Sequence, residues 1–114
     1  MDTISISIRK VDDFHVHFRQ GDVMGAYVRR SALWCERVLV MPNTIPSIRT
    51  ASDALMYKKE ILSSLDGEFD EADGMQNFTP LMTCKLYADH SPSDIVEMRQ
   101  AGIVACKLLS LIHI

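Results

Sequence analysis

The sequence predicts an α/β fold built on a parallel sheet, and three features of the chain predict it. Strand-like and helix-like segments alternate along the 114 residues, which is typical of right-handed βαβ units. The run 37–41 is compact and β-branched, as in a strand that is buried on both faces of a parallel sheet. Helix-start signals at Thr50 and Ser91 separate this run from two later strand-like runs.

The first third of the chain contains the first strands and the first helix of this pattern. The segment 4–8 alternates apolar and polar residues and predicts a lead-in strand. A second extended run, 11–18, carries two histidines. The segment 23–33 places apolar residues at helical spacing, so it is expected to form a helix before the strand at 37–41.

The next helix begins at a capping box, in which Thr50 is followed by Asp53. Its apolar face is expected to contain six residues: Ala51, Ala54, Leu55, Ile61, Leu62 and Leu65. An acidic loop at 66–77 leads to the run 78–86, which is expected to be the third strand of the sheet. Pro80 argues against a central position for that strand, because proline cannot donate to a ladder.

The last helix is expected to begin at Ser91, with Pro92 in its first turn, and to end at Gly102. The run 103–108 then predicts a fourth strand, which contains Lys107. Three strand–helix units and one further strand do not close an eight-stranded barrel. The residues alone are therefore also compatible with an open sheet.

Composition excludes several classes of partner. The net charge of −3 and the pI near 5.7 give no basic surface for nucleic acid or for an acidic membrane. No run is long and apolar enough for a membrane span or a signal peptide, so a cytoplasmic protein is expected. Cys35, Cys84 and Cys106 form no C-x-x-C pair, and we expect reduced, buried thiols rather than a disulfide or a zinc site.

The pair His15 and His17 is the sharpest chemical signal. Side chains alternate faces along a strand, so both imidazoles are expected on one side, where they can reach one metal ion. Phe14, Val16 and Phe18 would supply apolar walls on the other side. An H-x-H pair alone is also compatible with two polar residues on a strand surface. Its position at the end of an early strand favours metal binding, because α/β barrels place their active sites there.

Other polar residues follow the predicted strands. Lys107 closes the fourth strand, where a lysine either extends to water or reacts with CO₂ to give a metal-bridging carbamate. Arg19 offers a planar guanidinium for a carboxylate, with a surface salt bridge as the alternative. Asn43 offers donors beside it, or is simply a turn residue after Pro42. His90 is expected to be an exposed loop residue.

Four segments carry a resemblance to a known family. They are Asp-Asp-Phe-His-Val-His-Phe-Arg at 12–19, Val-Met-Pro-Asn at 40–43, Phe-Thr-Pro-Leu-Met-Thr-Cys at 78–84 and Ala-Cys-Lys-Leu at 105–108. In this order and spacing they resemble the single-domain bacterial-type dihydroorotases of the amidohydrolase superfamily. H-x-H marks the wider superfamily, whereas the second and third segments narrow the resemblance to dihydroorotase. Hydantoinase-like or allantoinase-like cyclic amidohydrolases, and a non-catalytic α/β module that binds a metal or a partner, are the alternatives.

The resemblance implies the first three to four units of a TIM (β/α)8 barrel of the metal-dependent hydrolase type. In such an enzyme His15 and His17 would bind the more buried of two zinc ions in each complete subunit. Lys107, as N6-carboxylysine, would bridge both ions. Arg19 and Asn43 would hold the α-carboxylate of the substrate. The implied reaction is the reversible cyclisation of N-carbamoyl-L-aspartate to L-dihydroorotate in pyrimidine biosynthesis. The resemblance also implies a homodimer as an assembly open to the complete enzyme.

The chain departs from the family's pattern after Leu108, where the family continues with Tyr-Pro. Two further zinc-binding histidines, the catalytic aspartate and a substrate-covering loop follow Lys107 in the family. We therefore expect residues 1–108 to be an N-terminal part of an amidohydrolase barrel that is inactive alone. Residues 109–114 match the translation of a sequencing-library adaptor and are expected to be a non-native tail, so His113 is given no role.

Overall fold

The computed structural model describes residues 2–66 and 77–108, so the expectations for 109–114, for His113 and for most of the acidic loop lie outside the described residues. The elements in chain order are β1 (Val11–Val16), the short 3-10 helix η1 (Gly21–Val23), α1 (Met24–Trp34), β2 (Cys35–Val40), α2 (Ala51–Ser63), β3 (Thr79–Lys85), α3 (Pro92–Gln100) and β4 (Ala105–Lys107). Strands and helices thus alternate as the sequence predicts.

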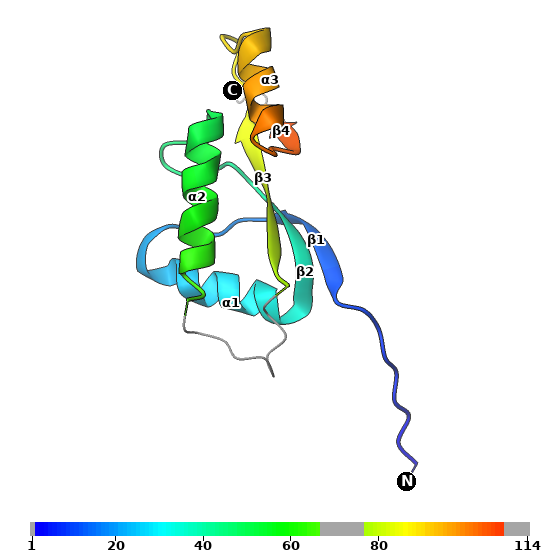
Figure 1. Ribbon diagram of the computed structural model, residues 1–114. Coiled ribbons are helices and arrows are strands. Elements are labelled where there is room, and N and C mark those ends of the chain that lie inside the picture. Colours follow the sequence, from blue (N-terminus) through cyan, green and yellow to red (C-terminus); the bar gives the residue numbers. More distant parts are fainter. Residues whose placement is uncertain (1, 67–76, 109–114) are drawn as a thin grey trace, which may run out of the picture.

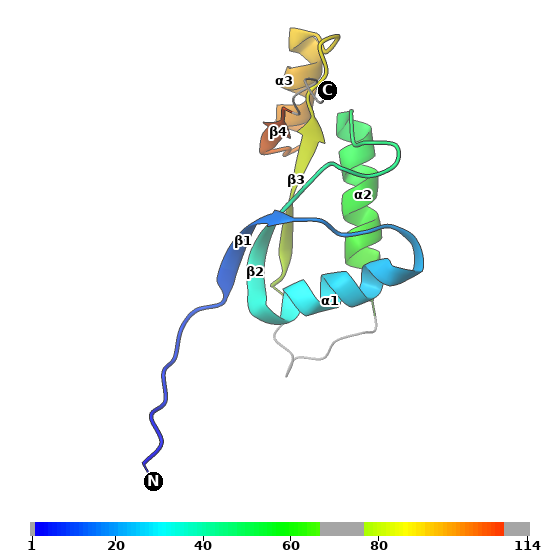
Figure 2. The ribbon, with the colours of Figure 1, turned by 180° about the vertical axis from the view of Figure 1, so that it is seen from behind.

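The strands form one parallel sheet in the order β1-β2-β3-β4. The sheet curls, and α1 and α2 lie together on the same side of β2 and β3 (Figures 1 and 2). α1 packs on β2 and α2 packs on β3, while α2 also contacts both other helices. This arrangement is that of a partial (β/α)8 barrel, in which helices cover the outer face of a parallel sheet. The predicted fold class is confirmed.

The ladder between β1 and β2 is irregular, and this irregularity affects the predicted apolar walls. The register shifts between Val11 and Asp12 and again between Asp13 and Val16. Val16 and Phe18 are buried as expected, but Phe14 is 78% exposed. The prediction for Phe14 is therefore wrong, because the second shift breaks the regular alternation of faces on which it rested.

Pro80 lies within β3, between β2 and β4, so the expectation that proline excludes a central strand is wrong. Pro80 pairs with Val38 of β2, whereas β4 pairs only with residues 83–85 of β3. At the position of Pro80, β3 therefore has one neighbouring strand, and the missing N–H interrupts no ladder on the other side. Pro80 is fully buried there.

Both predicted helix starts are confirmed as complete capping boxes. The Thr50 hydroxyl accepts a hydrogen bond of 3.0 Å from the Asp53 amide, and the Asp53 carboxylate accepts one from the Thr50 amide. Ser91 and Asp94 repeat the arrangement at α3, with Pro92 as the first helical residue. Gly102 follows α3 with a φ of +84°, a left-handed conformation that suits glycine and ends the helix.

The core lies between the sheet and these helices. α1 contributes Met24, Val28 and Ala32, which are one helical turn apart. On α2 the buried residues are Ala51, Ala54, Tyr57 and Ile61. Leu55 and Leu62 are 47% and 39% exposed, which differs from the prediction. The buried face of α2 includes Tyr57, which the predicted apolar face did not. Leu55 and Leu62 lie at the edge of this buried face and are partly exposed to solvent.

The predicted lead-in strand is wrong. Residues 2–10 form an arm that runs away from the sheet and has no ladder partner among the described residues (Figure 1). Ile4, Ile6 and Ile8 are between 76% and 87% exposed. Alternation gives this segment the pattern of a strand, but a strand also requires a neighbour to accept its backbone hydrogen bonds.

Candidate functional site

The candidate site residues lie at the carboxyl ends of the strands. His15 is in β1 and His17 follows it, Asn43 comes after β2, and Lys107 is the last residue of β4. The carboxyl ends of parallel strands share one edge of a sheet, so these side chains lie near one another although they are far apart in the sequence. The amide of Met41 donates a 2.9 Å hydrogen bond to the Val16 carbonyl and joins β1 to β2 at this edge.

His15 and His17 face the same way, as predicted. Their Nε2 atoms are 3.0 Å apart and their ring centroids 5.0 Å apart. Both side chains are exposed, while Val16 between them is buried. The amide of His15 also donates a 3.0 Å hydrogen bond to Asp13 Oδ1, which fixes the strand locally.

The Nε2 atoms of His15 and His17 are placed to serve as two of the ligands of one zinc ion. Two nitrogens at ~2.0–2.1 Å from one tetrahedral zinc lie about 3.3 Å from each other. The observed 3.0 Å between the Nε2 atoms is close to that separation, so a small rotation of the rings would suffice. Within residues 2–66 and 77–108, no group of three or more His, Cys, Asp or Glu side chains is placed to hold a metal ion. A site here would need a modified lysine or residues outside those ranges.

Lys107 and Asn43 are in direct contact. The Lys107 amine donates a hydrogen bond of 2.8 Å to the Asn43 side-chain oxygen. Lys107 is half-buried, so it does not extend freely to water from the end of β4. The Leu86 amide donates a 2.9 Å hydrogen bond to the Lys107 carbonyl, which holds the backbone of Lys107 against the segment that follows β3.

The electrostatics of the edge are those of a cationic site. Burial lowers the pKa of His17, and the positive charges of Lys107, His15 and Arg19 lower it further. These residues are therefore close enough to act on one imidazole. A cluster of this kind favours a neutral imidazole, which is the form that binds metals, and it attracts an anionic ligand.

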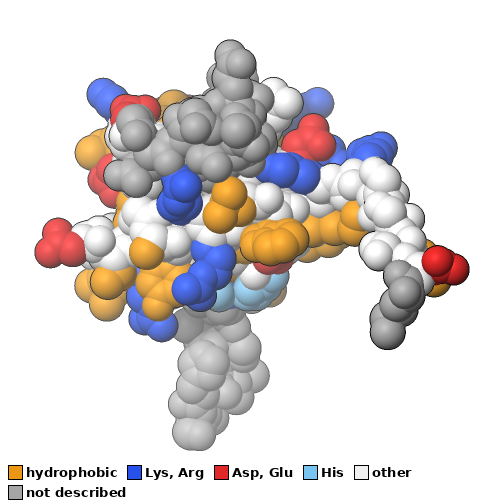
Figure 3. Space-filling view, turned by 90° about the horizontal axis from the view of Figure 1, so that it is seen from below, with side chains coloured by type: hydrophobic (Ala, Val, Ile, Leu, Met, Phe, Trp, Pro, Cys, Tyr) orange, Lys and Arg blue, Asp and Glu red, His pale blue; other side chains and the backbone are white. Residues whose placement is uncertain are grey.

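An open cavity of about 500 Å³ adjoins the pair, and His17, Arg19 and Asn43 all line it. The remaining lining residues are Phe18, Gln20, Val23, Met41, Thr44, Ile45 and Tyr57. Gln20 Oε1 accepts a 3.2 Å hydrogen bond from the Ile45 amide, so the segments after β1 and β2 are joined across the cavity. Figure 3 shows histidine side chains at the surface, with Lys or Arg side chains next to them.

Tyr57 is a wall residue that the sequence did not single out. Its side chain is buried, and its hydroxyl donates a hydrogen bond to the Phe18 carbonyl from α2. This contact holds the segment after β1 where Arg19 faces the cavity. The sequence feature that could have identified Tyr57 is its position among the aliphatic residues of α2. A phenol that is buried there needs a polar partner for its hydroxyl.

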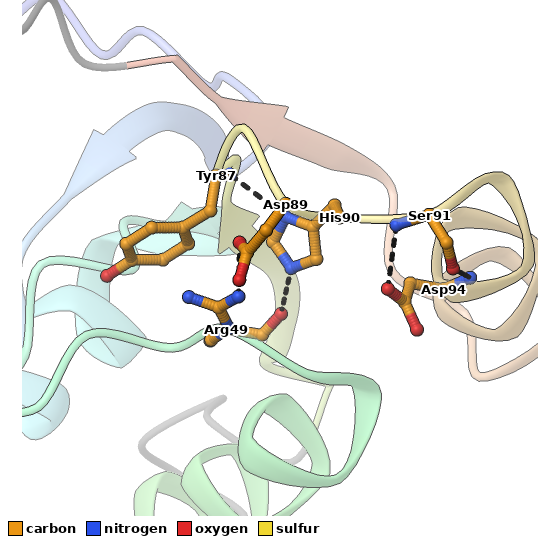
Figure 4. A network of polar contacts seen from close by, with 6 residues as sticks. All are labelled: Arg49, Tyr87, Asp89, His90, Ser91 and Asp94. Atoms are coloured by element: carbon orange, nitrogen blue, oxygen red, sulfur yellow. Dashed lines mark hydrogen bonds and ion pairs between the residues drawn. The ribbon is translucent and has the colours of Figure 1, made fainter.

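His90 is not the exposed loop residue that was predicted. The Tyr87 amide donates a 2.9 Å hydrogen bond to His90 Nδ1, so Nε2 carries the proton and donates to the Arg49 carbonyl at 2.9 Å (Figure 4). The Arg49 guanidinium lies 4.3 Å from the centroid of the Tyr87 ring and pairs with Asp89. His90 therefore joins the segment before α2 to the segment after β3.

The cysteines depart in part from the expectation. All three are free thiols, and Cys35 and Cys84 are buried as predicted, but Cys106 is exposed. Cys106 lies in the short strand β4, which has one neighbouring strand in the described part of the chain. For residues 2–66 and 77–108, no helix is sufficiently long and apolar to span a membrane.

Comparison with known proteins identifies the relatives of this chain. It is 41% identical over 106 residues to a dihydroorotase of Delftia acidovorans, a match that covers 93% of the chain. It is 38% identical over 99 residues to a mitochondrial dihydroorotase of Oryza sativa, covering 87% of the chain. The chain is a homologue of dihydroorotases.

The fold agrees with dihydroorotases of known structure. The crystal structure of the Campylobacter jejuni dihydroorotase superposes with a TM-score of 0.72 at 26% identity, over 87% of this chain. The Saccharomyces cerevisiae dihydroorotase, solved with 5-fluoroorotic acid, superposes with a TM-score of 0.72 at 25% identity, over 90% of this chain. No family model matches the sequence.

The chain is much shorter than these relatives. It spans 29% of the Delftia acidovorans dihydroorotase, 23% of the Oryza sativa protein and 27% of the Campylobacter jejuni chain. Homology to dihydroorotases therefore applies to one part of their barrel.

Proposed function

We propose that this chain forms part of a dihydroorotase, which reversibly cyclises N-carbamoyl-L-aspartate to L-dihydroorotate in pyrimidine biosynthesis. The observation that carries the proposal is the convergence of His15, His17 and Lys107 at one edge of the sheet, in a homologue of dihydroorotases. Metal-assisted opening of a carboxylated cyclic amide uses a metal ion for the amide and a cationic group for the carboxylate, and this edge offers residues for both.

His15 and His17 would hold a zinc ion through Nε2. Lys107 is a ligand only after its amine has reacted with CO₂, since a carbamate supplies two anionic oxygens and a protonated amine supplies none. When bound, a pair of zinc ions lowers the pKa of a bridging water and polarises the amide carbonyl.

Arg19 and Asn43 would bind the substrate's α-carboxylate. Both line the 500 Å³ cavity next to His17, which has room for a single-ring carboxylate. The Arg19 guanidinium can bind a carboxylate through two parallel hydrogen bonds. We propose a ligand of the same class as the 5-fluoroorotic acid with which the Saccharomyces cerevisiae relative was solved, namely a carboxylated pyrimidine ring.

The remaining machinery is proposed to come from the rest of the barrel, because this chain spans 29% of the Delftia acidovorans relative. That part would supply two more zinc-binding histidines, the catalytic aspartate and the loop that covers the substrate. We accordingly propose that residues 1–108 are the N-terminal part of the barrel and that the 114-residue chain is inactive by itself. The non-native origin of 109–114, the cytoplasmic location and the homodimer stay predictions.

A graft tests the proposed function. Residues 2–108 would replace the matching segment of the Campylobacter jejuni dihydroorotase, and the purified graft would be assayed with dihydroorotate and with hydantoin. We expect zinc to be bound and dihydroorotate to be opened, with both lost in the His17→Ala graft. A folded, zinc-loaded graft that opens hydantoin and leaves dihydroorotate intact would overturn the proposal in favour of another cyclic amidohydrolase.

A further inference from the structure

Cys84 and Cys106 are direct partners across β3 and β4. Paired residues of parallel strands project to the same face of the sheet, and neighbouring strands are ~4.7–4.9 Å apart. A disulfide requires Cα atoms at about 4.4–6.8 Å and side chains that point the same way. The registered pair meets both requirements, and both thiols are free.

The contacts of the two sulfurs agree with this placement. Cys84 Sγ donates a 3.6 Å hydrogen bond to the Thr50 carbonyl, which precedes α2. Cys106 Sγ lies 3.9 Å from the sulfur of Met98 on α3. Each sulfur therefore faces the helices. Burial raises the pKa of Cys84 to about 11, and the neighbouring Cys106 thiol contributes to the rise, so the two groups are close enough to interact.

Access to the two thiols differs. Cys84 has no exposed surface, whereas Cys106 is exposed among the described residues. A small reagent can therefore reach Cys106 first, and its registered, buried partner Cys84 is then placed to complete the exchange. We propose that Cys84 and Cys106 form a reversible redox site, which a low-molecular-weight disulfide such as glutathione disulfide oxidises to a cross-strand disulfide.

The exchange takes place in two balanced steps. The Cys106 sulfur attacks one sulfur of glutathione disulfide, which breaks the S–S bond and releases one glutathione as its thiol. The Cys84 sulfur then attacks the Cys106 sulfur of the mixed disulfide and releases the second glutathione. The two cysteines lose two electrons and two protons in total, and glutathione disulfide gains both as two thiols.

The bond would lie next to the candidate site without depending on it. Cys106 immediately precedes Lys107, and the next registered pair of the same ladder is Lys85 with Lys107. A link at Cys106 would fix the short strand β4 to β3 one residue before the amine that contacts Asn43. The inference rests on strand register and on the contacts and exposure of the two thiols, and it is independent of the dihydroorotase proposal.

The test uses the 114-residue chain with Cys35→Ser, so that only the proposed pair remains. The chain is equilibrated with mixtures of reduced and oxidised glutathione, in buffer and in concentrated urea, and acid-quenched samples are quantified by mass spectrometry. We expect the effective concentration of the pair to be about tenfold higher, or more, in buffer than in urea, because the fold holds the two thiols together. An equal or lower value in buffer would overturn the proposal.

The Cys84→Ser chain is the matched control, since it retains Cys35 and Cys106. Cys35 begins β2, at the opposite end of the sheet from the β3 position that pairs with Cys106. The folded chain should therefore form the Cys35–Cys106 disulfide less readily than the urea-unfolded chain. The effective concentration of this pair should thus be lower in buffer than in urea, opposite to the change expected for Cys84 and Cys106. Equal behaviour of the two pairs in buffer would show that register does not select the bond, and would overturn the proposal.

Discussion

The amine of Lys107 donates a hydrogen bond to the side-chain oxygen of Asn43, 64 residues earlier in the chain. Neither residue is near the other in sequence, and each follows or ends a strand of the same parallel sheet. Their contact joins β4 to the segment after β2, although β3 lies between these two strands in the sheet. The candidate site is therefore held by the sheet as a whole and not by one loop, which gives its side chains a fixed separation.

Replacing Arg19 should weaken substrate binding in the grafted enzyme. Arg19→Met removes the guanidinium from the cavity, and we expect KM for dihydroorotate to rise by roughly 10- to 100-fold, the range for loss of a hydrogen bond to a charged group. Steady-state kinetics measure this change. Arg37→Met is the control, because Arg37 pairs with Asp12 at 2.5 Å and is not among the residues that line the cavity. An unchanged KM in Arg19→Met would remove Arg19 from the substrate site.

Zinc content should depend on the imidazoles of His15 and His17. We expect His15→Ala and His17→Ala grafts to lose bound zinc, because each substitution removes one of the two facing Nε2 ligands. Elemental analysis after dialysis measures the loss. His90→Ala is the matched histidine control, since both ring nitrogens of His90 are occupied by backbone groups. Full zinc occupancy in His17→Ala would contradict the ligand assignment.

His90 should stabilise the fold. In His90→Ala the Tyr87 amide and the Arg49 carbonyl lose their partner, and we expect the free energy of unfolding to fall by about 1–3 kcal/mol. Urea denaturation of the 114-residue chain measures the change. His90→Gln can accept and donate, and should recover part of the loss. Asp89→Asn, at the exposed end of the Arg49 pair, should change the free energy of unfolding much less than His90→Ala, because solvent screens an exposed ion pair. A His90→Ala chain as stable as the wild type would refute this role.

Alkaline pH should destabilise the chain through Tyr57. Burial raises the pKa of Tyr57 from 10.0 to about 12, so the folded state holds the phenol proton more tightly than the unfolded state. The resulting stability is fully present below pH 10 and is lost as the pH rises through about 12. Urea midpoints between these pH values should fall less steeply for Tyr57→Phe than for the wild type. Identical slopes would mean that Tyr57 ionises equally easily in both states.

The sequence predicted the features that local chemistry determines. The capping boxes at Thr50 and Ser91 each depend on residues three positions apart, so their pattern is complete within one turn of chain. The common orientation of His15 and His17 likewise follows from their spacing within one strand. The family resemblance assigned Lys107 and Asn43 to one active site, but it did not predict the direct contact between them.

The features that the sequence did not predict depend on a partner elsewhere in the chain. Phe14 is exposed because the ladder with β2 shifts register, and nothing within β1 reports that shift. His90 was predicted to be exposed because its two partners are backbone groups, which carry no sequence signature. The segment 4–8 has the alternation of a strand, but pairing depends on a neighbour that the pattern does not specify.

The strand order β1-β2-β3-β4 also has a consequence for how the chain acquires its fold. Among the described strands, each one after β1 hydrogen-bonds to the strand that precedes it in the chain, so none of these three requires a more distant segment before it can pair. A sheet of this kind can grow one unit at a time as the ribosome releases it, with modest loop-closure entropy at each addition. Synthesis and assembly can then proceed in the same direction, from β1 towards β4.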